Sequence, residues 1–241
     1  MRELLKKMLT TKVVFSRALV GPPSLGPAVE IYEGDMFAHA RTLASQGVRV
    51  ALHNFANNTL PGLLDIEYDG THIWLTNTQE EQLLRASTVN GKTFLPLDMY
   101  PISTGREVAG LYTPSVLFNR TPREGKLLPG VLHYTADVVT CALPCGPLLR
   151  GAEYAPGIED EVVKHMVLVL TMAKDADVFV TGLWGCGAFC HPIKASLKAW
   201  RRALHCTAEA PPVVHFCYMK DGLTMLLSPD EESVDVMDIL A

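Results

Sequence analysis

The chain has 241 residues, of which 48% are hydrophobic, 20% charged and 7% aromatic. This composition is typical of a soluble globular protein with one well-buried core or two small ones, and it excludes disordered, collagen-like and disulfide-framework proteins. The formal net charge is -5. We therefore do not expect the protein to bind nucleic acid mainly by neutralising its phosphates with Lys and Arg side chains. Any anionic ligand would have to be held in another way.

The charge is unevenly distributed along the chain. Residues 1–20 carry five basic side chains against Glu3 alone, whereas residues 228–241 carry five acids and no base. We expect a basic N-terminal helix rather than a transit peptide, because Glu3 and the lack of serine enrichment disfavour the latter. No uncharged apolar run approaches the ~20 residues of a membrane helix, so no membrane association is expected.

Six cysteines lie in the C-terminal half, and two pairs of them have Cys-x-x-x-Cys spacing. This is not the tight spacing of a zinc knuckle, and His191 and His205 add no matching repeat. We therefore predict no metal site. Without a secretory signal, the cysteines are expected to be reduced thiols of an intracellular protein, cytoplasmic or nuclear.

Predicted strands and helices alternate along the chain. Apolar or alternating runs predict strands at 29–32, 48–55, within 131–143, at 178–182 and at 213–219. Capping residues and first-turn acids predict helices at 35–46, 158–176, 192–204 and from Ser228 onward. The alternation indicates an α/β domain with a mixed sheet between helical layers. We expect an extension at 1–28 and one domain at 29–241, with long connections at 57–78 and 91–110.

A glycine-rich loop, with Gly182, Gly185 and Gly187, joins the strand at 178–182 to the following helix. Glycines spaced in this way leave backbone N–H groups free to wrap a phosphate, and the helix N-terminus adds partial positive charge. The alternative is a tight strand-to-helix turn. The spacing matches neither the dinucleotide fingerprint nor a Walker loop.

Two further stretches carry polar side chains at element ends. Asn54, Asn57 and Asn58 close the strand at 48–55, where open α/β sheets bind ligands, although asparagine also favours plain turns. Thr78 and Glu81 form the pattern of a helix capping box, which needs no catalytic role. A glutamate beside a diphosphate could nevertheless serve as a general acid, because a neighbouring anion raises its pKa.

Taken in order, six segments of the chain resemble the microbial-type poly(ADP-ribose) glycohydrolases, a branch of the macrodomain superfamily. The resemblance implies a macrodomain-like three-layer α/β/α fold, hydrolysis of a glycosidic bond that releases ADP-ribose, and no cofactor or metal. The segments are Gly34-Asp35, 50–57, Gln79-Glu80-Glu81 with 84–88, 111–118, 137–144 and 182–189.

The resemblance also implies individual roles. Glu81 would be the general acid/base, with Glu80 orienting ribose hydroxyls. Asp35 would meet the adenine amine, and Asn57 the distal ribose, with Asn54 and Gln79 completing the site. Backbone amides would hold the diphosphate and an aromatic ring would pack on the ribose, contributed by Gly185, Cys186, Gly187, Ala188 and Phe189.

The chain departs from the family pattern at one point. A Gly-Gly-Gly run normally stands shortly before Gln-Glu-Glu, whereas here Pro61-Gly62 is followed by Leu63-Leu64, and Gly70 is the only later glycine before Gln79. The partner expected from the resemblance is ADP-ribose, an ADP-ribosylated protein or poly(ADP-ribose). A non-catalytic ADP-ribose-binding module and an α/β protein for an unrelated nucleotide stay open as alternatives, as does the oligomeric state.

Overall fold

The computed structural model describes residues 10–22, 26–62, 65–68, 71–74, 78–87, 94–104, 107–220 and 235–240. Their centre is a seven-stranded mixed sheet in the order β1-β6-β7-β3-β10-β11-β2, in which β7, β3, β10, β11 and β2 run parallel and β6 is antiparallel to both of its neighbours. The strands are β1 Thr11–Val14, β2 Ala28–Glu33, β3 Val50–Phe55, β6 Ala109–Phe118, β7 Tyr134–Cys141, β10 Val178–Gly182 and β11 Val213–Tyr218.

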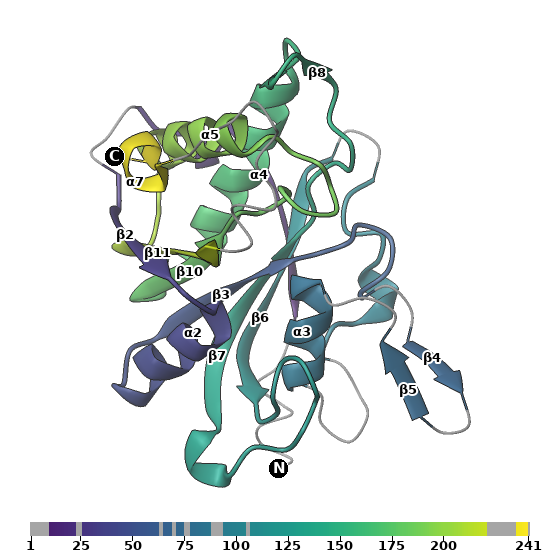
Figure 1. The fold of residues 1–241 in the computed structure, drawn as a ribbon. Helices are drawn as coiled ribbons and strands as arrows, with labels where there is room; N and C mark the ends of the chain where they lie inside the picture. Colours follow the sequence, from purple (N-terminus) through teal and green to yellow (C-terminus); the bar gives the residue numbers. More distant parts are fainter. Residues whose placement is uncertain are drawn as a thin grey trace.

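Helices cover both faces of this sheet (Figure 1). Residues of α2 and α3 pack with one face of the central strands, and residues of α4, α5 and α7 pack with the other. The predicted three-layer α/β/α architecture with a mixed central sheet is therefore confirmed. The helices are α2 Met36–Ser45, α3 Gln79–Ser87, α4 Ile158–Met172, α5 Ile193–Cys206 and α7 Val236–Leu240.

Shorter elements lie in the connections. Two antiparallel pairs flank the main sheet, β4 Asp65–Tyr68 with β5 Thr71–Trp74 and β8 Leu149–Arg150 with β9 Glu153–Tyr154. Single 3-10 turns are η1 Arg17–Leu19, η2 Leu97–Met99 and η3 Gly130–Leu132. The expected long connection at 57–78 thus contains a hairpin of its own.

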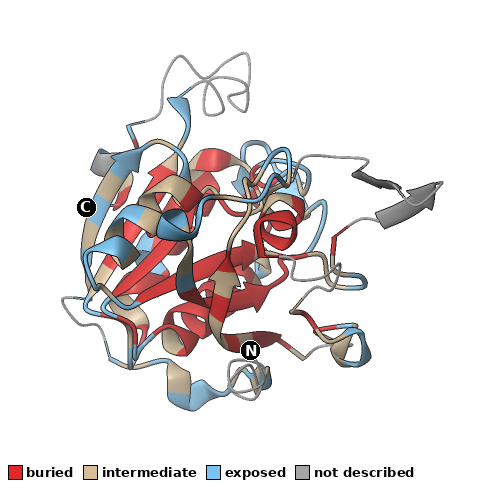
Figure 2. Ribbon diagram, turned by 90° about the horizontal axis from the view of Figure 1, so that it is seen from below, coloured by how far each residue is buried: buried red, intermediate tan, exposed pale blue. Residues whose placement is uncertain are grey.

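Local sequence signals explain several element boundaries. Asp35 caps α2 by accepting a hydrogen bond from the Ala38 N–H at 2.7 Å. Alternation along β3 turns His53 towards the rings of Phe179 and Trp184 and Asn54 towards α3. The buried strands form the centre of the molecule, and exposed residues lie around them (Figure 2).

The structure corrects the prediction at β1, the edge strand, and at its neighbour β6. Residues 11–14 form β1, which pairs with β6, where a helix was expected; residues 1–9 and the predicted helix start at Ser228 lie outside the described residues. Strand β6 was not predicted because Pro114 interrupts its pattern. The pairing with β7 shifts between Thr113 and Val116, and Ser115 there has φ 54°. This bulge accommodates a proline that cannot donate to the ladder.

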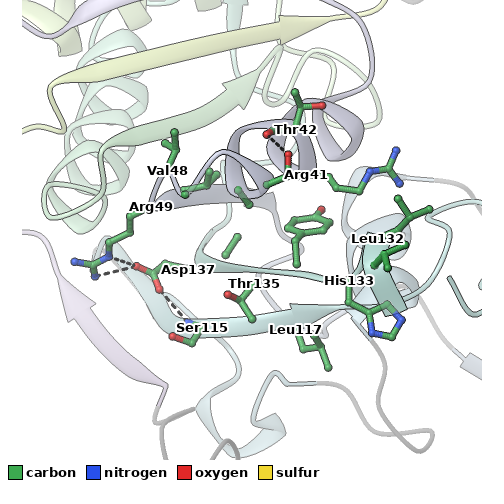
Figure 3. Close-up of a pocket in the computed structure, with 17 residues that line it drawn as sticks. Arg41, Thr42, Val48, Arg49, Ser115, Leu117, Leu132, His133, Thr135 and Asp137 are labelled. Carbon is green, nitrogen blue, oxygen red and sulfur yellow. Dashed lines mark hydrogen bonds and ion pairs between the residues drawn. The ribbon is translucent and has the colours of Figure 1, made fainter. Parts of the chain in front are cut away.

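A broad hollow of about 820 Å³ lies at the amino ends of β3 and β7 (Figure 3). At its wall the Asp137 carboxylate accepts hydrogen bonds from the Arg49 guanidinium at 3.0 and 3.1 Å, the Tyr112 hydroxyl at 2.7 Å and the Ser115 N–H at 2.9 Å. Asp137 is buried, whereas about half of the Arg49 side chain is exposed. One carboxylate therefore joins β3, β6 and β7 at the bulge.

We expect Asp137→Ala to lower the free energy of unfolding by about 3 kcal/mol, because it leaves the Tyr112 and Ser115 donors without their acceptor. Urea unfolding followed by circular dichroism measures this loss. Asp137→Asn is the matched control, since its amide oxygen can still accept from Ser115, and it should cost less. An Ala variant as stable as the Asn variant would contradict this role for the carboxylate.

Candidate functional site

A cavity of about 270 Å³ lies at the carboxyl ends of β3 and β10. Its wall combines the end of β3, the first turn of α3 and the glycine-rich loop after β10. Three stretches that are far apart in the sequence are thereby brought together at the edge of the sheet where α/β folds bind ligands. The lining residues are Phe55, Asn57, Thr78, Gln79, Glu80, Leu183, Trp184, Gly185, Gly187, Ala188 and Phe189.

The Glu80 carboxylate is held by three donors. One oxygen accepts from the Asn54 side-chain amide at 3.2 Å, and the other accepts from the backbone N–H groups of Asn57 and Gly62, both at 3.0 Å. The Asn54 amide also donates to the Thr140 hydroxyl at 3.3 Å. Glu80 therefore ties the start of α3 to the loop that follows β3.

Burial dominates the electrostatics of Glu80. Only 3% of the residue is exposed, and this desolvation raises the pKa of its carboxyl from 4.5 to about 7, against the lowering effect of the three donors. The neighbouring Glu81 carboxylate raises it further. A carboxyl with a pKa near neutrality can exchange a proton with a substrate under physiological conditions.

Glu81 lies on the same helical turn in a different environment. Its carboxylate accepts from the Thr78 N–H at 3.3 Å, and its own N–H donates to the Thr78 hydroxyl at 3.4 Å. The predicted capping box is thus confirmed. Glu81 is 1% exposed and is not among the residues that line the cavity. In this state its carboxylate lies on the helix cap rather than on the cavity wall.

Gln79 fixes the helix that carries both glutamates. Its side-chain oxygen accepts from the Phe55 N–H at 2.8 Å, and its side-chain nitrogen donates to the His53 carbonyl at 2.7 Å. Strand β10 pairs with β3 only through residues 50–52. The Gln79 amide therefore occupies ladder positions of β3 that β10 leaves open.

The glycine-rich loop approaches the cavity with several of its backbone groups. Gly185, Gly187, Ala188 and Phe189 line the cavity, and Gly185 adopts φ +83°, where a side chain would be strained. A Cβ at Gly185 would also lie 2.8 Å from Leu143 and 2.9 Å from His191. Cys186 differs, because it is buried and its N–H donates to the Leu183 carbonyl at 3.3 Å. The Cys186 N–H is therefore used within the loop and does not point to the cavity, contrary to its predicted contact with the diphosphate.

The remaining predicted residues lie further from the cavity or within its framework. Asn57 lines it, but its side-chain oxygen accepts from the Thr59 N–H and hydroxyl, both at 2.8 Å. Asn54 is fully buried behind Glu80. Asp35 is exposed at the carboxyl end of β2, three strand spacings from β3, or about 14 Å. An extended ligand would be needed to contact Asp35 and the glutamates together.

A second cavity of about 840 Å³ adjoins the first and shares Asn57, Ala188 and Phe189 with it. Its other wall is the loop after β7, which includes Pro144, Cys145 and Gly146. Ala188 and Phe189 therefore lie between two hollows at the same sheet edge.

Within the described ranges no group of three or more His, Cys, Asp or Glu side chains could hold a metal ion. The same part of the chain has no helix long and apolar enough to cross a membrane.

Comparisons with known proteins place the fold. No family model matches the chain, and no curated protein sequence matches it significantly. Among solved structures, a poly(ADP-ribose) glycohydrolase from Deinococcus radiodurans in complex with ADP-ribose is 23% identical, with a TM-score of 0.66, and the match covers 91% of this chain and 90% of that one. The enzyme from Thermomonospora curvata bound to the inhibitor ADP-HPD is 21% identical, with a TM-score of 0.64, over 90% of this chain and 82% of that one.

The chain has the fold of a microbial poly(ADP-ribose) glycohydrolase. The resemblance predicted from sequence is thus confirmed at the level of the fold.

Within this glycohydrolase fold, Gly62 takes part in the site although the triple glycine is absent. It is buried with φ +57°, a Cβ there would lie 2.9 Å from Leu84, and its N–H donates to Glu80. Gly62 was not among the predicted site residues, and neither were Leu183 and Trp184, which line the cavity. The sequence signal was the Pro61-Gly62 pair itself, because a glycine after proline is typical of a turn with positive φ, where the backbone can approach a neighbour closely. Leu63, Leu64 and Gly70 lie outside the described residues.

Proposed function

We propose that this protein is an ADP-ribosyl hydrolase of the poly(ADP-ribose) glycohydrolase type. The observation that carries the proposal is that the first turn of α3, which holds the buried Glu80 and Glu81, lies at the same edge of the sheet as the Gly185–Phe189 loop, with Glu80 on the wall of the shared cavity. A carboxyl group supplies acid/base chemistry, and free backbone amides suit a diphosphate. The glycohydrolases of similar fold, solved with ADP-ribose or with an inhibitor, support this assignment.

We assign the role of general acid to Glu81 and a positioning role to Glu80. The Glu81 carboxyl gives its proton to the oxygen that leaves the anomeric carbon, water adds its hydroxyl to that carbon, and the proton released by water returns to Glu81. The 3.3 Å hydrogen bond from the Thr78 N–H to the Glu81 carboxylate must break when substrate binds. Glu80, engaged on both oxygens, keeps the 57–62 loop in place.

The substrate contacts follow the same assignment. Asp35 would meet the adenine amine, Asn57 the distal ribose, and the amides of Gly185, Gly187 and Ala188 the diphosphate. Phe189 would pack on the ribose. We further propose an intracellular setting, cytoplasmic or nuclear, which is supported by six cysteines free of disulfides.

The direct test incubates the purified protein with poly(ADP-ribose) and, separately, with mono-ADP-ribosylated protein, and measures free ADP-ribose by chromatography. We expect release from at least one of the two substrates. Calorimetry with ADP-ribose completes the test. Failure of ADP-ribose to bind at all would overturn the assignment of the cavity.

A non-catalytic ADP-ribose-binding module is the second candidate. It is supported by the position of Glu81, whose carboxylate lies on its own helix cap. Binding of ADP-ribose without release from either substrate would favour this candidate.

The raised pKa of Glu80 makes a prediction about stability. Glu80 is ionised above pH 4.5 in the unfolded chain but only above about 7 in the folded one, so the folded state binds more protons between these values. This group's contribution to stability is complete below pH 4.5 and is lost as pH rises to about 7, at no more than about 1.4 kcal/mol per pH unit. Glu80→Gln should remove this slope.

Urea unfolding of wild type and Glu80→Gln at pH 5 and pH 7.5 measures the effect. The difference between the two proteins isolates Glu80 from the buried histidines, which titrate in both. Parallel pH dependences in the two proteins would contradict the raised pKa.

A further inference from the structure

Two of the six cysteines are exposed, and both belong to the loops that line the candidate site. Cys145 lies in the loop after β7, and Cys190 follows Phe189 in the glycine-rich loop. Cys141, Cys186 and Cys217 are buried, and Cys206 is half-buried.

Two contacts between the loops flank the exposed cysteines. On one side of the pair the Gly146 N–H donates to the Phe189 carbonyl at 3.0 Å, and on the other side His191 Nε2 lies 2.8 Å from the Pro144 carbonyl. Each cysteine therefore stands between two residues that contact the other loop. The backbone hydrogen bond joins the peptide group that follows Cys145 to the one that precedes Cys190. A disulfide needs such adjacency, because it joins residues whose Cα atoms lie about 4.4–6.8 Å apart.

The three buried cysteines are poor competitors for an oxidant. Burial raises the pKa of the Cys141, Cys186 and Cys217 thiols to about 12. The thiolate is the reactive form, so these three groups stay protonated and shielded. Cys145 and Cys190 are the two thiols most open to an oxidant in solution, since Cys206 is half-buried.

We propose that Cys145 and Cys190 form a reversible disulfide that links the two loops of the site. Hydrogen peroxide would be the oxidant. One thiolate attacks it to give a sulfenic acid and hydroxide, which takes up a proton to become water. The second thiol then attacks the sulfenic sulfur, forming the S–S bond and releasing a second water, so that two thiols and one peroxide yield one disulfide and two waters. Two molecules of glutathione, or one molecule of a dithiol such as dithiothreitol, reverse the step: the protein disulfide is reduced to two thiols and the reductant is oxidised to its own disulfide.

The link requires movement of the turn that separates the two cavities. The Cys190 sulfur now lies 3.9 Å from the Ala188 carbonyl, and the Cys190 N–H donates to the Gly187 carbonyl at 2.9 Å. Turning the sulfur towards Cys145 breaks these contacts and moves residues 187–189. Two of these residues, Ala188 and Phe189, line both cavities. Oxidation therefore lowers ADP-ribose affinity, a consequence that rests on the proposed function, whereas the disulfide itself does not.

The test treats the purified protein with hydrogen peroxide, removes excess oxidant, and maps peptides by mass spectrometry. We expect the loss of two titratable thiols, a mass decrease of two hydrogens, and a peptide pair joined through Cys145 and Cys190. Cys145→Ser and Cys190→Ser should each abolish the linked pair, and Cys206→Ser should retain it. A protein in which both thiols are oxidised without becoming linked would overturn the proposal.

Calorimetry with ADP-ribose then separates the formation of the disulfide from its effect on ligand binding. We expect a dissociation constant at least tenfold higher after oxidation, restored by dithiothreitol and unchanged by peroxide in Cys145→Ser. Formation of the link with unaltered affinity would overturn the effect on the site. No ADP-ribose binding by the reduced protein, with the disulfide formed, would refute the proposed function and leave the dithiol assignment standing.

Discussion

Replacing Glu81 by Gln should slow the release of ADP-ribose by about 10²- to 10⁴-fold, the usual contribution of a positioned acid, while ADP-ribose still binds. The amide keeps the size of the side chain and can accept from the Thr78 N–H, so the helix cap survives. It cannot give a proton to the leaving oxygen. Single-turnover assays with wild type and variant, together with calorimetry on ADP-ribose, measure the two effects separately.

Glu80→Gln is the matched control, because it lies next to Glu81 and is equally buried. It weakens the hydrogen bonds from Asn57 and Gly62, and we expect a smaller loss of rate together with weaker binding. If Glu80→Gln abolishes release while Glu81→Gln retains wild-type rates, the assignment of the general acid is reversed. That outcome would fit the position of Glu80 on the cavity wall.

Gly182→Ala should destabilise the fold by about 3 kcal/mol, which corresponds to a fall in melting temperature of about 6–12 °C. A Cβ at Gly182 would lie 2.4 Å from the Cys217 carbonyl oxygen on β11 and 3.7 Å from the Phe55 ring. The nearer atom belongs to the backbone of a paired strand, so relief requires β10 and β11 to move apart. Differential scanning calorimetry measures the change.

Gly130→Ala is the control for this substitution. A Cβ at Gly130 has no neighbour within 4 Å, and its backbone is not left-handed. Its melting temperature should stay close to that of wild type. Equal stability of the two variants would show that the strands at Gly182 can move apart at little cost.

Much of the fold could be predicted because local signals coincide with burial. The Asp35 cap, the apolar run of β3 and the first-turn acids of α4 predicted their elements within a few residues. Strand β6 escaped prediction because its pairing tolerates Pro114 through a bulge, and that bulge depends on Asp137, which is distant in the sequence. The local sequence pattern of β6 cannot reveal a bulge that depends on a hydrogen bond to a residue on another strand.

The candidate site was predictable in its parts more than in its arrangement. The Gln79-Glu80-Glu81 motif and the glycine-rich loop do meet at one cavity, but sequence could not tell which carboxylate faces it. Neighbouring residues on a helix point in different directions, and the contacts that separate Glu80 from Glu81 come from the 54–62 loop and from Thr78. Cys186 likewise follows the pattern of the loop but bonds within it.

The Gln79 side chain has a consequence for how the site tolerates change. Its amide acts as a detached peptide group that adds two hydrogen bonds to β3, at Phe55 and His53. Glu80 and Glu81 follow Gln79 directly, so these two hydrogen bonds anchor the start of α3 to a strand, in addition to the contacts that Asn57, Gly62 and Thr78 make with the two carboxylates. This anchor does not pass through residues 63–77, so we expect a change in the length of that connection to leave the start of α3 on β3.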